Sequence, residues 1–217
     1  MQVLLGEGSE MAMTTVDFAV PASEAELEAL AEKLRARNFE VVIVQDGAEA
    51  KAEVLKRIPE GAQVHSGKSK TLEDAGLFKE FMEGDRFDFV RKRTMKLDPK
   101  TQRDEIRKLG AAPDVMVNSA HAVTDEGQIV ITSASGSQIG PIASGAGRLI
   151  LVIGSQKIVP DLDAAFRRIR EHVFPYEDAR LREAMGIGTK ITRTLILDQD
   201  FMPGRTTVIL VREPIGV

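Results

Sequence analysis

Two segments far apart in the chain gather residues that can hold anions. The first is HSGKSKT, whose candidate ligand-binding residues are Ser66, Gly67, Lys68, Ser69 and Thr71. The second runs from Asn118 to Lys157 and has three polar, glycine-containing loops separated by short apolar runs. Structure alone rarely needs so many glycines and hydroxyls together, so we expect the two segments to form two walls of one pocket.

The HSGKSKT loop lies between a predicted strand and a predicted helix. Backbone N–H groups at a helix start, together with the helix dipole, favour a phosphate or another anion, and Lys68 and Lys70 add positive charge. The spacing matches neither G-x-x-x-x-G-K-[ST] nor G-x-G-x-x-G. In the alternative interpretation, Thr71 caps the helix and the serines solvate an ordinary turn.

Three residues near the middle of the chain could move protons. Asp125 and Glu126 lie in the turn TDEG, where one carboxylate could act as a base or a nucleophile; plain turn acids are the alternative. His121 lies beside this turn and could shuttle protons near neutral pH, although a histidine in a loop is often a bystander. We take these three as the catalytic candidates.

The other ligand-binding candidates lie at predicted strand ends. They are Asn118, Ser135, Gly136, Ser137, Gln138, Gly154, Gln156 and Lys157. The last three follow the apolar run RLILVIG, and open α/β sheets bind ligands at that end of their strands. Lys157 is a candidate anion partner, and a solvated lysine is the alternative.

Helices and strands must alternate to position these loops. Ser23 and Glu26 form a capping box, and apolar residues at helical spacing predict a helix over 23–36. A buried strand is predicted over 39–44, followed by a helix over 48–58, a short strand over 63–65 and a helix over 71–83. This alternation is typical of a parallel sheet.

The second half continues with mixed elements. A helix follows Pro99 and ends near Gly110, and an amphipathic helix is predicted over 161–173, with Arg167, Arg168 and Arg170 on a solvated face. The predicted strands cover 115–117, 128–131, 149–153, 194–197 and 206–211, the last two joined by a turn. We therefore predict a three-layer α/β fold with a mostly parallel sheet and antiparallel pairing near 123–131 and at the C-terminus.

Composition limits the classes of function. The 217 residues fit one domain, predicted over 23–217 after an N-terminal extension over 1–22. Cysteine is absent and the three histidines fall in different predicted elements, so we expect no metal site and no cofactor. The net charge of -4 argues against nucleic acid. No run approaches a membrane span and no export signal is visible, which predicts a cytoplasmic protein.

Several segments resemble the lactate utilization (LUD) domain family. They are RIPEGAQVHSGKSKTLEDAGL, PDVMVNSAHAVTDEGQIV, ASGSQIGPIASGAGRLILVIGSQKIVPDLDAAFRRIR and TVILVREPIGV. The resemblance implies the fold of ribose-5-phosphate isomerases, glucosamine-6-phosphate isomerases and coenzyme A transferases, whose loops hold a sugar phosphate or an acyl-CoA. It also implies a non-redox role in lactate or related organic-acid utilization, binding an anionic small molecule and docking on iron–sulfur partner subunits.

The chain departs from the family pattern in its presumed pocket. Where this chain has Ala120 and His121, relatives carry an asparagine–alanine pair. They carry a glycine–asparagine–arginine run where it has residues 136–138, and an asparagine where it has Gln156. Many relatives also carry a cysteine cluster after the late helix, which this chain lacks, so a cluster-binding role is in doubt here.

The alternative function is a stand-alone isomerase-like or CoA-transferase-like enzyme using Asp125 or Glu126. Exposed late strands would also suit a homodimer.

Overall fold

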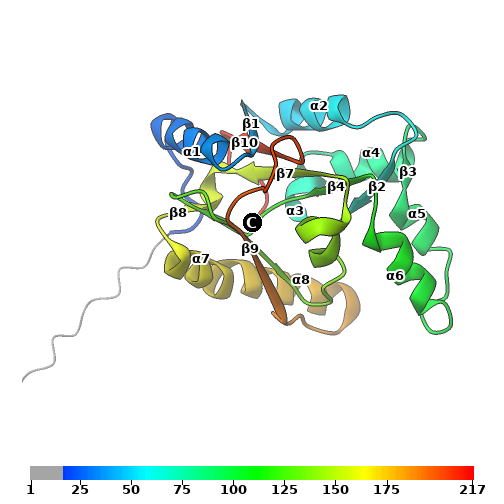
Figure 1. The fold of residues 1–217 in the computed structure, drawn as a ribbon. Coiled ribbons are helices and arrows are strands. Elements are labelled where there is room, and N and C mark those ends of the chain that lie inside the picture. Colours follow the sequence, from blue (N-terminus) through cyan, green and yellow to red (C-terminus); the bar gives the residue numbers. More distant parts are fainter. Residues whose placement is uncertain (1–16) are drawn as a thin grey trace, which may run out of the picture.

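Two β-sheets organise the chain in the computed structural model, which describes residues 17–217 (Figure 1). The larger sheet has six strands in the order β1-β10-β7-β4-β2-β3, and every neighbouring pair is parallel. Its strands are β1 (Glu40–Val44), β2 (Gln63–Ser66), β3 (Asp88–Phe89), β4 (Val115–Asn118), β7 (Arg148–Gly154) and β10 (Thr206–Val211). The parallel strands bring the carboxyl ends of β2 and β4 to one edge, where Ser66 pairs with Val117.

The smaller sheet has four strands and mixed pairing. Its order is β8-β5-β6-β9, with bounds Ile158–Val159, Ala122–Thr124, Ile129–Ser133 and Arg193–Leu197. β6 is antiparallel to both β5 and β9, whereas β5 and β8 are parallel. The antiparallel pairing predicted over 123–131 is therefore confirmed.

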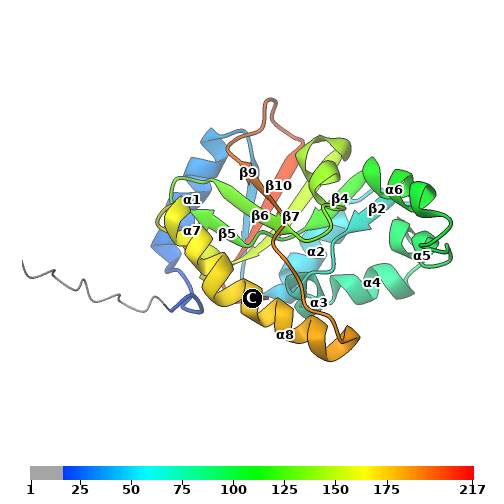
Figure 2. The ribbon, with the colours of Figure 1, turned by 90° about the horizontal axis from the view of Figure 1, so that it is seen from below.

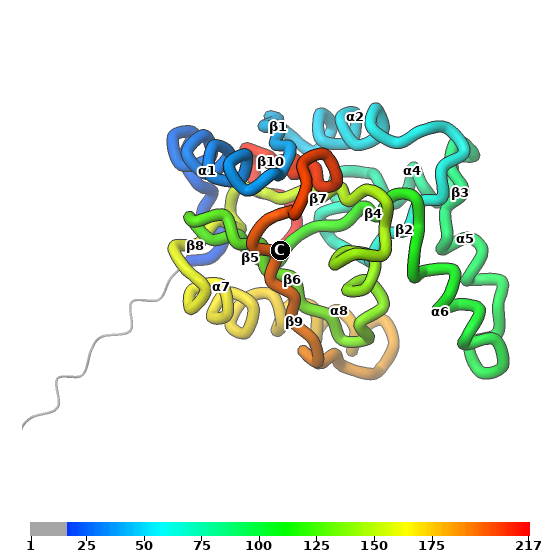
Figure 3. Tube along the Cα trace, in the orientation of Figure 1, coloured from blue at the N-terminus to red at the C-terminus, as the bar shows by residue number. Residues whose placement is uncertain are grey.

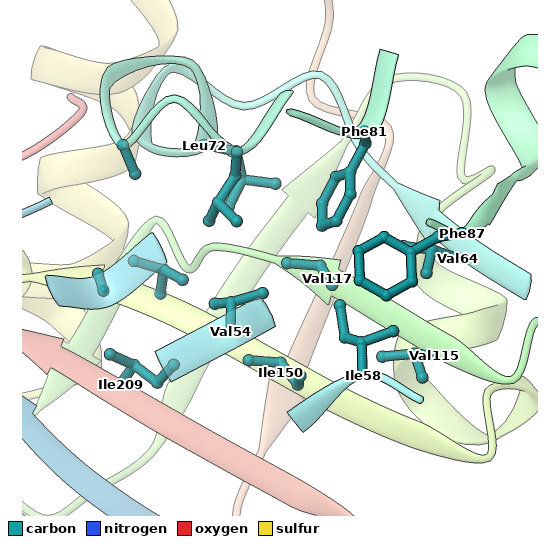
Figure 4. Close-up of a cluster of buried hydrophobic side chains, with 14 of the residues drawn as sticks. Val54, Ile58, Val64, Leu72, Phe81, Phe87, Val115, Val117, Ile150 and Ile209 are labelled. Atoms are coloured by element: carbon teal, nitrogen blue, oxygen red, sulfur yellow. The ribbon is translucent and has the colours of Figure 1, made fainter. Parts of the chain in front are cut away.

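Helices cover one face of the large sheet and bury a continuous apolar cluster (Figure 4). α2 (Gly47–Arg57) contributes Val54 to this cluster, α3 (Lys70–Asp74) contributes Leu72, and α4 (Leu77–Glu83) contributes Phe81. These side chains lie over Val117 and Ile150 of the central strands. Apolar burial of this extent supplies most of the free energy that stabilises such a layer.

The opposite face is covered by α1 (Glu24–Ala36) and by the small sheet. Ser23 caps α1 and forms the predicted capping box with Glu26. Leu27, Leu30, Ala31 and Leu34 of α1 are buried in the same cluster as Ile129 and Ile131 of β6. α7 (Leu162–Arg168) then covers the outer face of the small sheet, where Ala165 packs with Ala122.

The remaining elements connect these layers. They are α5 (Val90–Thr94), α6 (Arg103–Ala111), α8 (Phe174–Met185), the π-helical turns Pro141–Gly145 and Ile169–Val173, and a 3-10 turn at Ser155–Lys157. α7, the second π turn and α8 follow one another along one side (Figure 2). The C-terminal segment returns to the middle of the fold (Figure 3). No helix of residues 17–217 has the length and apolarity to cross a membrane.

The three-layer, mostly parallel α/β fold is confirmed, with three local corrections. The helix predicted over 71–83 is two helices, because Gly76 adopts φ +70° between α3 and α4. The helix predicted to end at Val173 continues through Pro175 into α8. The strands predicted at 194–197 and 206–211 are not neighbours, since β9 joins the small sheet and β10 the large one.

The predicted N-terminal extension, 1–22, lies mostly outside the described residues. Within its described part, Asp17 to Ala22, the side chain of Phe18 is buried against the outer face of the small sheet. Ala22 N–H donates to the carbonyl of Ser155, 3.4 Å away. This short stretch therefore packs on the domain that follows it.

Candidate functional site

A cavity of about 380 Å³ opens where the carboxyl ends of β2 and β4 meet the small sheet. The HSGKSKT loop forms one wall, and the segment from Asn118 to Gln138 supplies much of the other. α8 and residues 189–191 close the far side. The structure thus brings together the two segments that the sequence singled out.

Lys157 supplies the cavity with a buried amine. Only 3% of this residue is exposed, and its Nζ donates to Thr71 Oγ1 at 2.7 Å, Ser119 Oγ at 3.1 Å and the carbonyl of Ala120 at 3.2 Å. All three acceptors are neutral, so burial lowers the pKa of Lys157 to about 7, with a further lowering from Arg168 and a smaller opposing effect from Asp74. The alternative of a solvated lysine is wrong.

The HSGKSKT residues all line the cavity but differ in burial. Ser66 is 1% exposed, and its Oγ has no hydrogen-bond partner within the described chain. Lys68 is exposed at the rim. α3 spans five residues, and its N-cap Ser69 makes no side-chain cap hydrogen bond. The predicted helix-dipole contribution is therefore small here, and an unpaired hydroxyl with nearby lysines remains to hold an anion.

His121 borders the cavity in a neutral form. Its Nδ1 accepts a hydrogen bond from the backbone N–H of Thr132 at 3.1 Å, so the ring proton lies on Nε2. Burial, together with the charges of Lys157 and Arg168, lowers the pKa of His121 to about 3. The ring can donate a hydrogen bond from Nε2, but it does not match the proton shuttle predicted near neutral pH.

Arg168 lies fully buried beneath the same region, which corrects its prediction as part of a solvated face. Its Nη1 donates to the carbonyl of His121 at 2.5 Å, and its Nε donates to the carbonyl of Gln156 at 3.4 Å. Burial lowers the pKa of the guanidinium to about 10. Arg167 is half-exposed and pairs with Glu171, as a solvated face requires.

The opposite wall carries amides and hydroxyls. Asn118, Ser135, Ser137 and Gln138 line the cavity as predicted. A Cβ on Gly67 would fall 2.0 Å from Gln138 Oε1 and 2.9 Å from Asn118 Oδ1. The two walls therefore approach so closely at Gly67 that a side chain there would displace both amides.

Five predicted site residues lie outside this cavity. Asp125 and Glu126 follow β5 at the end remote from His121, and Glu126 pairs with Lys33 at 3.0 Å. Burial raises the pKa of Asp125. Neither carboxylate can serve as a base or nucleophile in this cavity, because the strand carries both away from it.

Gln156 and Gly154 hold the C-terminal segment instead of a ligand. Gln156 Oε1 accepts from Ile215 N–H at 3.2 Å, and its Nε2 donates to the carbonyls of Ile215 and Gly216 at 3.0 and 3.4 Å. A Cβ on Gly154 would lie 2.8 Å from Ile215 N. Gly136 has φ +78° and packs against Arg193, so its role is in the turn.

Other lining residues were not predicted as site residues, among them His65, Arg91, Ser119, Thr132, Tyr176 and Lys190. Burial, with the Arg91 charge, lowers the pKa of His65 to about 4. Ser119 adjoins the predicted Asn118 and could have been included on its hydroxyl alone. Arg91 belongs to a basic run, which the sequence predicts as a solvated face, and Lys190 carries no sequence signal; only the fold brings α5 and residue 190 to this opening. No cluster of three metal-ligating side chains occurs in the described part of the chain.

A comparison with protein families matches the LUD domain over residues 27–211. The chain belongs to the LUD domain family. A DUF162 family protein from Deinococcus radiodurans shares the fold, with a TM-score of 0.53 and 16% identity over 88% of this chain and 99% of that one. Ribose 5 phosphate isomerase A from Neisseria gonorrhoeae gives a TM-score of 0.33 at 13% identity over 54% of each chain. No curated protein sequence matches significantly.

Proposed function

We propose that this LUD-domain protein binds a small organic anion, bearing a carboxylate or a phosphate, in a step of lactate-related organic-acid utilization. The observation that carries the proposal is the amine of Lys157, buried beside the cavity with only neutral acceptors. A buried cation without a counter-ion is costly, and an anion that enters the cavity would lower this cost.

The charge around the opening supports the same ligand class. Lys68, Lys70, Arg91 and Lys190 line the cavity with Lys157, whereas Glu177 is the single acidic side chain among the lining residues of the described chain. Glu177 is already engaged by Arg180, at 2.6 and 2.8 Å. The field in the cavity is therefore positive, which favours entry of an anion.

The alternative enzyme, a CoA-transferase-like or isomerase-like catalyst, needs a carboxylate at the ligand. Asp125 and Glu126 do not line the cavity, so the two carboxylates assigned to this alternative lie away from it. Iron–sulfur partner subunits and a homodimer stay predictions.

Calorimetry on the whole protein tests the proposal, with lactate, pyruvate, ribose 5-phosphate and acetyl-CoA at matched ionic strength. We expect at least one anion to bind and to raise the melting temperature, since a ligand at 100 times its dissociation constant adds about 2.7 kcal/mol. Lys157→Met should weaken binding by roughly tenfold or more, as expected for a lost charge-assisted hydrogen bond. Met keeps the length of the side chain. The carbonyl of Ala120 loses the hydrogen bond from Lys157 but still accepts one from Ser119 Oγ.

Two lysine variants serve as controls. Lys100→Met, at an exposed position before α6, should bind like the wild type. Lys68→Met should cost less than Lys157→Met, because a rim charge is screened by solvent. The proposal fails if no anion binds, or if Lys157→Met binds every anion as tightly as the wild type.

A further inference from the structure

Lys157 is set apart from the other lysines of residues 17–217 by its burial. Charged lysines are almost never fully buried without a carboxylate partner. Its pKa of about 7, lowered by burial and by Arg168, leaves a large share of the amine neutral at physiological pH. A neutral lysine has a free lone pair and is a nucleophile toward carbonyl carbon.

The atoms around Nζ are suited to proton transfer. Thr71 Oγ1 and Ser119 Oγ lie 2.7 and 3.1 Å from the nitrogen, and each hydroxyl can accept or donate. The carbonyl of Ala120, at 3.2 Å, can only accept and so orients one N–H of the amine. The lone pair can therefore be freed while the two hydroxyls take up and return a proton.

We propose that Lys157 forms an imine with a carbonyl-bearing anion, either an oxo acid or a phosphorylated aldehyde. This inference rests on the proposed anion binding and narrows the substrate class to compounds with a carbonyl group. Lys68, Arg91 and Lys190, which line the same cavity, would hold the anionic group while the carbonyl carbon meets Nζ.

The step balances without an oxidant or a metal. The nitrogen lone pair forms a bond to the carbonyl carbon, the π electrons move to the oxygen, and a proton passes from nitrogen to that oxygen through a hydroxyl. A second proton then passes from nitrogen to the new hydroxyl group, the C–O bond breaks as water leaves, and C=N forms, so one amine and one carbonyl give one imine and one water. A 2-hydroxy acid such as lactate has no aldehyde or ketone group and would bind without forming an imine.

Reductive trapping tests the proposal on the intact protein. Pyruvate and glyceraldehyde 3-phosphate are the probes, each with sodium cyanoborohydride as hydride donor, and peptide mapping by mass spectrometry locates the product. With at least one probe we expect about one reduced adduct per chain, on Lys157, formed at least ~10 times faster than at any exposed lysine. Lactate should slow trapping by competition. Lys68 and Lys190 serve as internal controls, because they line the cavity but are exposed.

A variant adds a second check that does not depend on binding alone. Lys157→Arg keeps a cation but has no nucleophilic amine, so it should lose the adduct while circular dichroism shows whether it folds. If the variant does not fold, the position of the reduced adduct in the wild-type protein still tests the proposal. The inference is overturned by adducts spread over exposed lysines, or by none with either probe. If calorimetry still shows an anion binding in that case, the proposed function stands and the imine alone fails.

Discussion

Basic side chains at the cavity hold their protons weakly. Burial lowers the pKa values of Lys157, His121 and Arg168, and the charge of Arg168 lowers those of Lys157 and His121 further. Such groups raise the free energy of the empty site and make it sensitive to any anion that enters. Strongly perturbed pKa values in a cavity are typical of functional sites.

Acid should destabilise the protein through its buried histidines. His121 and His65 have pKa values of about 3 and about 4 in the fold, against 6.5 in the unfolded chain. The unfolded state therefore binds more protons as the pH falls below 6.5, so stability falls with it. We expect His121→Asn to reduce the loss in unfolding free energy between pH 7 and 4.5 by roughly 2–3 kcal/mol, measured by urea denaturation.

His172→Asn is the matched control for this pH effect. His172 is less buried, and its pKa is lowered less, by burial and by Arg168. Its substitution should change the pH dependence less than His121→Asn does. Equal effects of both variants would contradict the assignment to His121.

Arg168→Ala should destabilise the fold strongly. The change empties a fully buried position and leaves the carbonyls of His121 and Gln156 without the guanidinium. We expect a loss of about 3 kcal/mol in unfolding free energy, from the cavity and the unpaired carbonyls together. Arg167→Ala, one residue earlier and half-exposed, should stay within about 0.5 kcal/mol. A loss for Arg168→Ala as small as that for Arg167→Ala would contradict the stabilising role of Arg168.

Local sequence signals predicted most elements. The Ser23 capping box fixed the start of α1, and the apolar run after Gly147 fixed β7. Tertiary structure decided the element boundaries that local signals misplaced. The chain passes Pro175 because the π-helical turn at Ile169–Val173 precedes it, and the extra residue in that turn relieves the backbone crowding that proline causes.

Gly76→Ala tests the break between α3 and α4. Gly76 has φ +70°, and a Cβ there would meet nothing within 4 Å. Any loss must come from the backbone, so we expect about 1 kcal/mol in chemical denaturation. Gly140→Ala is the control, because its φ of -57° suits any residue and its Cβ would also meet nothing. It should be neutral or slightly stabilising.

At the scale of the molecule, the cavity depends on contacts that no local pattern encodes. Lys157 meets Thr71 across 86 residues and Ser119 across 38. The sequence predicted Thr71 and Lys157 as site residues from their loops, but not that they touch. It placed Asp125 beside the ligand as an acid of the TDEG turn, and β5 separates that turn from His121.

Gln156→Met should loosen the C-terminal segment. The amide makes three hydrogen bonds to Ile215 and Gly216, and Gly216 packs on Thr71. We expect a loss of about 1–3 kcal/mol and faster hydrogen exchange at the Ile215 amide. Gln128→Met, which loses an exposed hydrogen bond to Asp198, is the control and should leave that exchange unchanged. Unchanged exchange in Gln156→Met would contradict this role.

The place of β10 has a consequence for synthesis in the cell. This strand, residues 206–211, lies between β1 and β7, so β1 has no partner in the large sheet until it arrives. While these residues are still inside the ribosome, the nascent chain would expose the unpaired, hydrophobic edges of β1 and β7. We therefore expect completion of the large sheet to follow release of these residues, and arrested chains that end before Thr206 to need chaperones to stay unaggregated.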